Sequence, residues 1–219
     1  MEIKVCGLKI PTNVESVLQL GVHYVGFIFY ENSPRNLDLP PEAFTGFDKM
    51  HSKTVKKVGV FVNAKIEFVL EKVEAYQLDY VQLHGDENVF YCSKLKGKGI
   101  KLIKAFSVDE DFIFTQTEAY QYYCDYFLFD TKGKERGGNG IVFEWRILKR
   151  YRGKTPYFLS GGIKPEHAGK IKKLDYPMLK AVDLNSGFEI EPGFKNVVVI
   201  SDFINDLNTE RVGDWGSRR

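Results

Sequence analysis

Residues 56–84 read KKVGVFVNAKIEFVLEKVEAYQLDYVQLH, and this stretch decides the fold class. Its two ends, 56–62 and 79–84, are short runs rich in Val, Leu, Phe and Tyr, as expected of strands. The stretch between them, 63–76, has apolar residues at helical spacing and Asn63 as its expected cap. A strand, a helix and a second strand in this order predict βα units and a parallel sheet.

The same alternation continues along the whole chain. Six further strands are expected, at 3–6, 24–29, 101–106, 126–130, 156–160 and 181–185. A helix is expected at 12–21, capped by Thr12 or Asn13 and ended by Gly21. Others are expected at 86–97, with two acids in its first turn and Gly97 at its end, and within 194–208.

Eight βα units without a break in composition predict an α/β fold, a single (β/α)₈ TIM barrel slightly shorter than the usual ~250 residues. We expect the barrel to occupy residues 1–208, and the polar segment 209–219 to be a loose tail. A doubly wound open sheet is the alternative architecture.

The composition indicates a globular chain that acts on a small molecule. Hydrophobic residues make up 43% and aromatic residues 14% of the 219 residues, enough for a sizeable core. The 31 basic and 29 acidic residues leave a net charge of +2, so no overall field favours nucleic acid or a membrane. The run YVGFIFY at 24–30 is far too short to cross a bilayer. A local basic site for an anion stays open.

The spacing of cysteines and histidines predicts neither a disulfide framework nor a metal site. Cys6, Cys92 and Cys124 are far apart and form no CxxC pair, which favours a reducing, cytoplasmic location. The histidines show no ligand spacing such as HxxxH. We therefore expect no bound metal.

Polar residues stand at the ends of several expected strands, where barrels of this class carry their reacting groups. Cys6 ends the first strand and Gly7 follows it, and Arg35 comes after the second strand. Gln82 and His84 share one side of the fourth strand. Asp130 ends the sixth strand and leads into the glycine-rich stretch 131–140.

The turns after the last two strands suit a phosphate group. They contain Gly161 and Gly162 in one turn, and Ser186 and Gly187 in the other. Small residues let backbone N–H groups approach an anion closely, and barrels often bind phosphate at this position. Each turn alone is as consistent with an ordinary connection.

The other candidates also have structural explanations. Cys6 can be core filler, Asp130 a helix cap or a solvated strand end, and Arg35 a surface charge. Gln82 and His84 can hold a loop by hydrogen bonds.

An ordered set of short motifs is similar to the N-(5′-phosphoribosyl)anthranilate isomerase family of tryptophan biosynthesis. The resemblance runs from about residue 3 to residue 207, and CG after the first strand with SPR after the second makes it specific. The motifs are KVCGLK, GFIFYENSPRN, VGVFVN, VQLHGDE, FDTKG, GGNG, FEW, SGGIKPE, VDLNSGFE and PGFK.

The resemblance implies a cofactor-free Amadori rearrangement of an aldosylamine to a ketose. It implies that Cys6 is the general base, Asp130 the general acid and Arg35 the partner of the anthranilate carboxylate. The glycine turns would hold the phosphate, and Gln82 and His84 would at most line the site. The partner is a phosphosugar substrate, and the enzyme would be a monomer or a homodimer.

The chemistry makes demands on both proton-transfer residues. The acid must hold a proton near neutral pH to open the ribose ring, although a free aspartic acid titrates near 3.9. A free cysteine titrates near 8.5, so the base needs a nearby cation or oriented N–H groups. Gly7 would clear space for substrate beside the sulfur.

Four positions depart from the commonest pattern of the family: Asn139, Glu144, His167 and Phe188. None is a proton-transfer residue. Three other functions are considered. The related isomerase of histidine biosynthesis has an Asp where Cys6 stands, and indole-glycerol-phosphate synthase needs a lysine acid at a strand end. A non-catalytic phosphometabolite-binding barrel would not need both proton-transfer residues.

Overall fold

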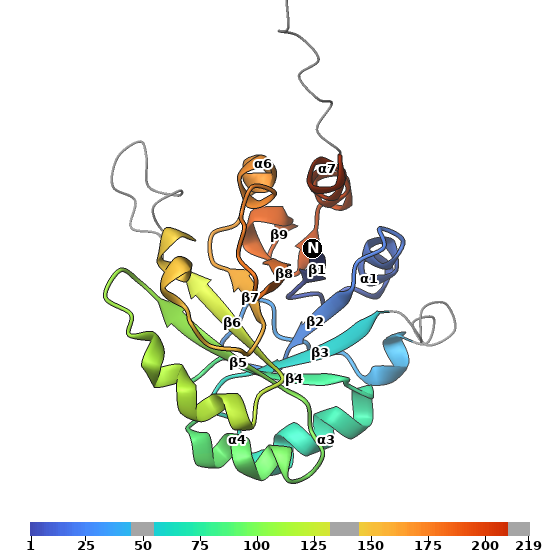
Figure 1. Cartoon of the computed structure of the whole chain (residues 1–219). Coiled ribbons are helices and arrows are strands. Elements are labelled where there is room, and N and C mark those ends of the chain that lie inside the picture. Colours follow the sequence, from blue (N-terminus) through green and yellow to red (C-terminus); the bar gives the residue numbers. More distant parts are fainter. Residues whose placement is uncertain (45–54, 132–144, 210–219) are drawn as a thin grey trace, which may run out of the picture.

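A computed structural model describes residues 1–44, 55–131 and 145–209 of the chain (Figure 1). Eight parallel strands form a closed barrel in the order of the sequence. Closure is shown by β1 and β8, which pair in parallel with Lys4 opposite Asp183. The predicted TIM barrel is therefore confirmed, and the open-sheet alternative is wrong because the first and last strands are neighbours.

The strands lie close to their predicted positions, which follows from their short runs of β-branched and aromatic residues. Their bounds are β1 Glu2–Val5, β2 Tyr24–Ile28, β3 Lys56–Phe61, β4 Tyr80–Leu83, β5 Leu102–Val108, β6 Tyr126–Thr131, β7 Tyr157–Ser160 and β8 Leu179–Leu184. A short antiparallel pair that we did not predict, β9 (Glu189–Glu191) with β10 (Phe194–Lys195), follows β8.

Side chains on the two faces of the barrel form two separate cores. The outward-facing residues pack under the surrounding helices in one large cluster that includes Ile3, Val5 and Phe129. The inward-facing residues form a smaller cluster of Tyr24, Val58, Ile103, Ala105, Leu128, Phe158 and Ala181. This second cluster fills the interior of the barrel, as the fold requires.

Aromatic rings close the interior at the N-terminal ends of the strands. Tyr24, Tyr80 and Tyr126 are the first residues of β2, β4 and β6. The ring centroid of Phe158 lies 4.9 Å from that of Tyr24 and 5.1 Å from that of Tyr126. We call these four residues the aromatic floor; they leave the C-terminal end of the barrel as the place for a site.

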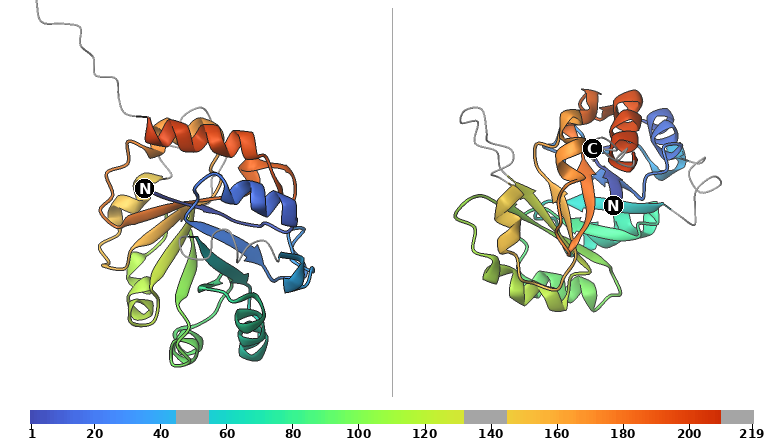
Figure 2. Two further views of the ribbon diagram at one scale, coloured as in Figure 1. Left: turned by 90° about the vertical axis from the view of Figure 1, so that its right-hand side faces the viewer. Right: turned by 45° about the horizontal axis from the view of Figure 1, so that its top comes forward.

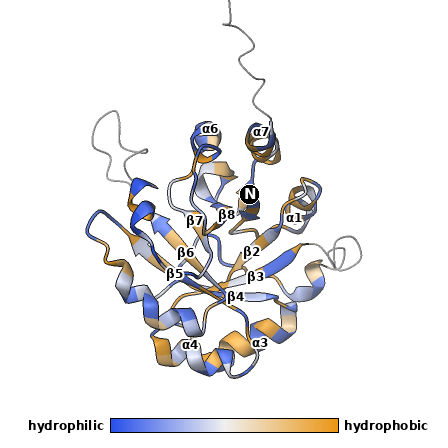
Figure 3. Cartoon of the chain, in the orientation of Figure 1, coloured by the Kyte–Doolittle hydropathy of each residue, from blue (hydrophilic) through white to orange (hydrophobic). Residues whose placement is uncertain are grey.

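The helices surround the barrel, and each carries hydrophobic and hydrophilic residues (Figures 2 and 3). The α-helices are α1 Pro11–Leu18, α3 Ile66–Tyr76, α4 Val89–Lys96, α6 Ala168–Ile171 and α7 Val197–Asn208. The 3₁₀ helices are η1 Pro41–Phe44, η2 Phe114–Tyr122, η3 Ile147–Arg150, η4 Pro165–His167 and η5 Ser186–Phe188. After β5, the described connection is therefore a 3₁₀ helix instead of the α-helix that the pattern predicts.

The apolar face predicted for α3 is confirmed, but its predicted cap is wrong. Val69 is fully buried, and Ile66, Leu70 and Val73 pack against the core. Asn63 lies before the helix with φ of 49°. Its side-chain oxygen accepts a hydrogen bond of 2.8 Å from the backbone N–H of Asp86, so it joins two loops instead of starting a helix.

Two further predictions of helix ends are also wrong. Helix α1 begins at Pro11, whose fixed φ suits the first helical position, and neither Thr12 nor Asn13 caps it. Asn13 is buried and instead binds the backbone N–H and C=O of Lys195, at 2.8 and 2.9 Å. The acids 86–87 precede α4 and are not in its first turn, because the Asn88 side chain caps this helix. The predicted end at Gly97 is confirmed.

Some predictions fall outside the described residues. They concern the glycine-rich stretch after Thr131, the departures Asn139 and Glu144, and the tail from residue 210. The barrel boundary at residue 208 stays a prediction. In the described ranges, no helix has both the length and the apolar character needed to span a membrane.

Candidate active site

A cavity of about 180 Å³ opens at the C-terminal ends of the strands. Cys6 and Asp130 both line it, although they are far apart in the sequence: Cys6 directly follows β1, and Asp130 lies in β6. Several other predicted residues line it as well, whereas Gly7, Arg35 and Gly187 are absent from its lining. The lining consists of Cys6, Ile28, Val60, Gln82, His84, Asp130, Ser160, Gly161, Gly162, Ile163, Asp183, Asn185 and Ser186.

Gln82, His84 and Asp130 form a hydrogen-bonded chain on one side of the cavity. Gln82 Nε2 lies 2.9 Å from His84 Nδ1, and His84 Nε2 lies 3.3 Å from Asp130 Oδ2. An amide nitrogen is a donor, so His84 accepts at Nδ1 and carries its proton on Nε2, from which it donates to Asp130. This contact occupies Oδ2 and leaves Oδ1 of Asp130 as the oxygen able to carry a proton.

The sulfur of Cys6 is held on the opposite side. Cys6 is only 3% exposed, and its backbone N–H donates to the C=O of Leu184 at 2.9 Å. A Cβ atom at Gly26 would lie 2.7 Å from the sulfur, so a side chain at this position of β2 would displace it. Glycine in β2 therefore keeps room for the thiol.

A buried ion pair lies beside the thiol. Lys4 Nζ is 2.9 Å from Asp183 Oδ1, and both side chains are nearly inaccessible. Burial raises the pKa of the Cys6 thiol above its ordinary value, and the Lys4 ammonium offsets only part of that rise. Lys4 is thus a cation of the kind that the chemistry requires, and we did not predict it. The alternation of β1, which places Lys4 and Cys6 on one face, is the signal that identifies it.

Gly7 lets two side chains approach the backbone next to Cys6. Its φ is +74°, a conformation that favours glycine. A Cβ atom there would lie 2.7 Å from Arg35 Cδ and 2.8 Å from Asn185 Oδ1. The space we expected for substrate is therefore filled by protein, and the glycine serves to seat Arg35 beside the cavity.

Arg35 makes a two-pronged contact with a carboxylate of the chain itself. Its Nε lies 2.9 Å from Glu189 Oε1, and its Nη2 binds Glu189 Oε2. Glu189 also accepts from Lys195 Nζ at 2.7 Å and from the N–H of Gly193 at 3.0 Å. Burial alone would raise the pKa of Glu189, but these hydrogen bonds lower it. A guanidinium has five N–H groups, and within the described ranges no acceptor is bound by Nη1, so this side can hold a second carboxylate.

The two glycine turns pack against each other. Gly161 and Gly162 have φ of +93° and +58°. A Cβ atom on Gly161 would lie 2.2 Å from the C=O oxygen of Thr131, and one on Gly187 would lie 2.2 Å from that of Ile163. Only residues without a side chain bring these backbones so close, so the first turn packs against the end of β6 and the second against Ile163, and both turns line the same cavity.

The two described departures from the family pattern lie away from the cavity lining. His167 packs edge-on against Trp145, with ring centroids 5.4 Å apart, and its Nδ1 accepts from the N–H of Lys164. Burial lowers the pKa of His167. Phe188 is buried against Phe203. Both are therefore packing residues.

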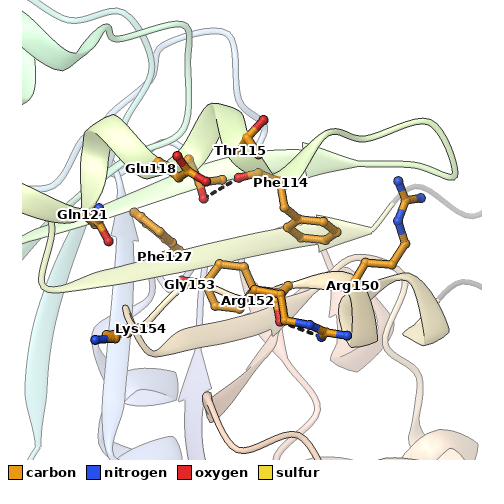
Figure 4. Close-up of a pocket in the computed structure, with 11 residues that line it drawn as sticks. Phe114, Thr115, Glu118, Gln121, Phe127, Arg150, Arg152, Gly153 and Lys154 are labelled. Atoms are coloured by element: carbon orange, nitrogen blue, oxygen red, sulfur yellow. Dashed lines mark hydrogen bonds between the residues drawn. The ribbon is translucent and has the colours of Figure 1, made fainter.

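A second hollow, of about 470 Å³, lies outside the barrel between η2 and residues 150–154 (Figure 4). Phe114 and Phe127 line it together with the exposed cations Arg150, Arg152 and Lys154. It shares no residue with the cavity at the strand ends. Within the three described ranges, no group of three or more His, Cys, Asp or Glu residues is placed to hold a metal ion.

Comparisons with known proteins agree along almost the whole chain. A family model described as N-(5′-phosphoribosyl)anthranilate (PRA) isomerase matches residues 3–206. A curated relative from Parabacteroides distasonis, named N-(5′-phosphoribosyl)anthranilate isomerase, is 46% identical over 207 residues, which cover 94% of this chain and 93% of the relative.

Solved structures are similar over the same length. A crystal structure of phosphoribosyl anthranilate isomerase from Thermotoga maritima has a TM-score of 0.78 and 33% identity, and covers 94% of this chain and 98% of that one. A phosphoribosyl anthranilate isomerase in complex with reduced 1-(o-carboxyphenylamino)-1-deoxyribulose 5-phosphate has a TM-score of 0.76 and 30% identity, with the same coverage.

Proposed function

The chain belongs to the N-(5′-phosphoribosyl)anthranilate isomerase family, as its motifs predicted, and is an isomerase; from this premise we propose that it converts N-(5′-phosphoribosyl)anthranilate into 1-(2-carboxyphenylamino)-1-deoxyribulose 5-phosphate in tryptophan biosynthesis. The observation that carries the proposal is the single cavity that both Cys6 and Asp130 line, beside two glycine turns. A related enzyme holds a reduced form of this product.

The reaction begins with opening of the ribose ring. Asp130 gives its proton to the ring oxygen as the bond from that oxygen to C1′ breaks, and the nitrogen lone pair forms a C1′=N⁺ imine. The hydrogen bond from His84 fixes one oxygen of Asp130 and leaves the other for the proton that is transferred. The Asp130 side chain is about one-third exposed and lines the cavity.

Proton removal from C2′ follows. The positive imine makes the C2′–H bond acidic, and the thiolate of Cys6 takes the proton to give an enolamine. Loss of the O2′ proton and addition of a proton at C1′ then give the ketone. No step needs an electron acceptor, because the oxidation of C2′ is balanced by the reduction of C1′ in the same molecule.

The two ends of the substrate carry negative charge, and both ends of the cavity suit anions. Arg35 binds the anthranilate carboxylate through its Nη1 side, while Glu189 holds its other edge. The turns at Gly161–Gly162 and Ser186–Gly187 hold the phosphate with backbone N–H groups. Fixing both ends leaves the ribose between base and acid.

The alternative reactions are less well supported. The described cavity lining contains no lysine, whereas indole-glycerol-phosphate synthase needs a lysine acid. Lys104 in β5 is buried and donates to Gly85 O and Glu87 Oε2, at 2.7 and 3.2 Å. It therefore holds the loop between β4 and α4 in place. The histidine-pathway isomerase remains a second substrate to test, and a phosphometabolite-binding barrel without activity remains the non-enzymatic alternative.

Fluorescence decay of phosphoribosylanthranilate after addition of the purified protein tests the proposal directly. We expect decay at a rate proportional to protein concentration, and an accumulating ketose that can be reduced with borohydride. The histidine-pathway aldosylamine serves as the parallel substrate. Binding of phosphoribosylanthranilate without any decay would favour the non-catalytic barrel. A cytoplasmic location and a monomeric or dimeric state stay predictions.

The variant Arg35→Ala is expected to raise KM for phosphoribosylanthranilate by roughly tenfold or more, because a charge-assisted two-pronged contact is lost. The expected change in kcat is smaller, since the carboxylate is bound in both the ground state and the transition state. Steady-state kinetics over a range of substrate concentrations measure the two constants. Arg150→Ala, at the outer hollow, is the control, and an unchanged KM in Arg35→Ala would remove the carboxylate contact from the proposal.

A further inference from the structure

Lys4 is a charged side chain in the middle of the barrel. Its side chain is 0% exposed, which is rare for lysine unless the charge is paired. It is paired: its partner Asp183 stands opposite it in the register of β1 and β8, with Nζ and Oδ1 2.9 Å apart. Burial lowers the pKa of the Lys4 ammonium, but the Asp183 carboxylate outweighs this and raises it above its ordinary value. The ammonium is therefore kept charged.

The strand geometry sets this charge beneath the thiol. Lys4 lies in β1 and Cys6 directly follows the strand, two residues on, so both side chains point toward the barrel axis. Besides binding Asp183, the ammonium acts on the nearby sulfur: of the groups that lower the pKa of the Cys6 thiol, Lys4 has the largest effect. An ammonium has three donors, so its bond to Asp183 does not use all of them.

The other cations near Cys6 act less strongly on its thiol. Lys195 and Arg35 lie on its outer side, and both bind Glu189, which offsets much of their charge. Asp183 faces the sulfur with a negative charge and opposes the thiolate. Among the described residues, Lys4 is thus the cation that lowers the pKa of the thiol most.

We propose that Lys4 is a positioning residue for the base: held by Asp183, it keeps a positive charge under the sulfur of Cys6 and stabilises the thiolate that removes the C2′ proton. This inference rests on the proposed role of Cys6. It accounts for part of how a buried thiol gives up its proton: burial raises the pKa of Cys6, and a charge in a poorly hydrated interior acts strongly on its neighbours and offsets part of that rise.

The test follows the protonation of Cys6 without any substrate. In a Cys92→Ala, Cys124→Ala background, Cys6 is the remaining thiol, and the ¹³Cβ chemical shift of labelled cysteine reports its titration. We expect Lys4→Met to raise the midpoint by about one pH unit, which is tenfold less thiolate at a given pH. The acid limb of kcat/KM should move to higher pH by the same amount. Lys4→Arg, which keeps the charge, should restore most of both.

Lys180→Met is the matched control, because Lys180 is also a barrel lysine with a carboxylate partner, Glu2, but is 39% exposed at the other end of β8. It should leave the midpoint unchanged. If Lys4→Met does not fold, the double variant Lys4→Met/Asp183→Asn removes both buried charges, and a smaller rise is expected. An unchanged midpoint in either variant overturns the inference.

The same data separate this inference from the proposed function. If the midpoint rises in Lys4→Met but Cys6→Ala stays fully active, the assignment of Cys6 as base is wrong while the effect of Lys4 on the sulfur stands. If Cys6→Ala is inactive and the midpoint in Lys4→Met does not move, the role of Lys4 is wrong and the base assignment stands.

Discussion

Replacing Cys6 by Ala is expected to lower kcat for phosphoribosylanthranilate by roughly 10²-fold or more, the usual contribution of a general base. The reason is that the described cavity offers no equivalent group to receive the C2′ proton. Asp183 is held by Lys4, and Asp130 lies with His84 at the other side. KM should change little, because the sulfur contacts neither charged end of the substrate. The fluorescence assay gives both constants.

The matched control is Cys92→Ala. Cys92 is also a buried thiol, in α4, but it is not in the cavity lining. Its loss should cost some stability from a small void and leave turnover at the wild-type level. Circular dichroism establishes that both variants fold. Turnover near the wild-type rate in Cys6→Ala would rule out the thiol as base.

Asp130→Asn should also lower kcat by roughly 10²-fold or more. Asparagine has the same shape and still accepts the hydrogen bond from His84, so the geometry is kept while the acidic proton is lost. Ring opening then has no proton donor, although both ends of the substrate are still bound. The variant should therefore bind the reduced product analogue with near-normal affinity, which calorimetry measures alongside turnover.

Asp86→Asn is the control for this second variant. Asp86 is an exposed acid in the loop after β4, at the same end of the barrel as His84, and does not line the cavity. Its substitution should change neither kcat nor affinity. If Asp130→Asn turns over like the wild type, another group opens the ring, and if it fails to bind the analogue, its role is in binding.

The strands were predictable from sequence, but several connections were not. Apolar runs such as those at 126–130 and 156–160 identify strands, because parallel strands are buried on both faces. The segment between β5 and β6 has no apolar stripe at helical spacing, and it forms the 3₁₀ helix η2. Predicted helix caps were wrong where a tertiary contact used the side chain instead, as the backbone of Lys195 does with Asn13.

The site was predictable only in part. Strand ends in a barrel converge, so Cys6 and Asp130 could be placed at one opening from their positions alone. Lys4 and Asp183 were missed because they lie within apolar strands, where only the alternation of faces marks them as inward. The contact of Arg35 with Glu189 joins residues 154 positions apart through a hairpin, β9–β10, that we did not predict.

The aromatic floor determines from which end of the barrel substrate and product reach the cavity. Tyr24, Tyr80, Tyr126 and Phe158 fill the N-terminal end of the barrel, so its interior is no channel. Substrate enters and product leaves at the C-terminal end, where the cavity opens. Burial raises the pKa of Tyr24, so this ring stays neutral over the working range of an enzyme. The Lys4–Asp183 pair is thus shielded from solvent at this end of the barrel, and its two side chains are almost fully buried.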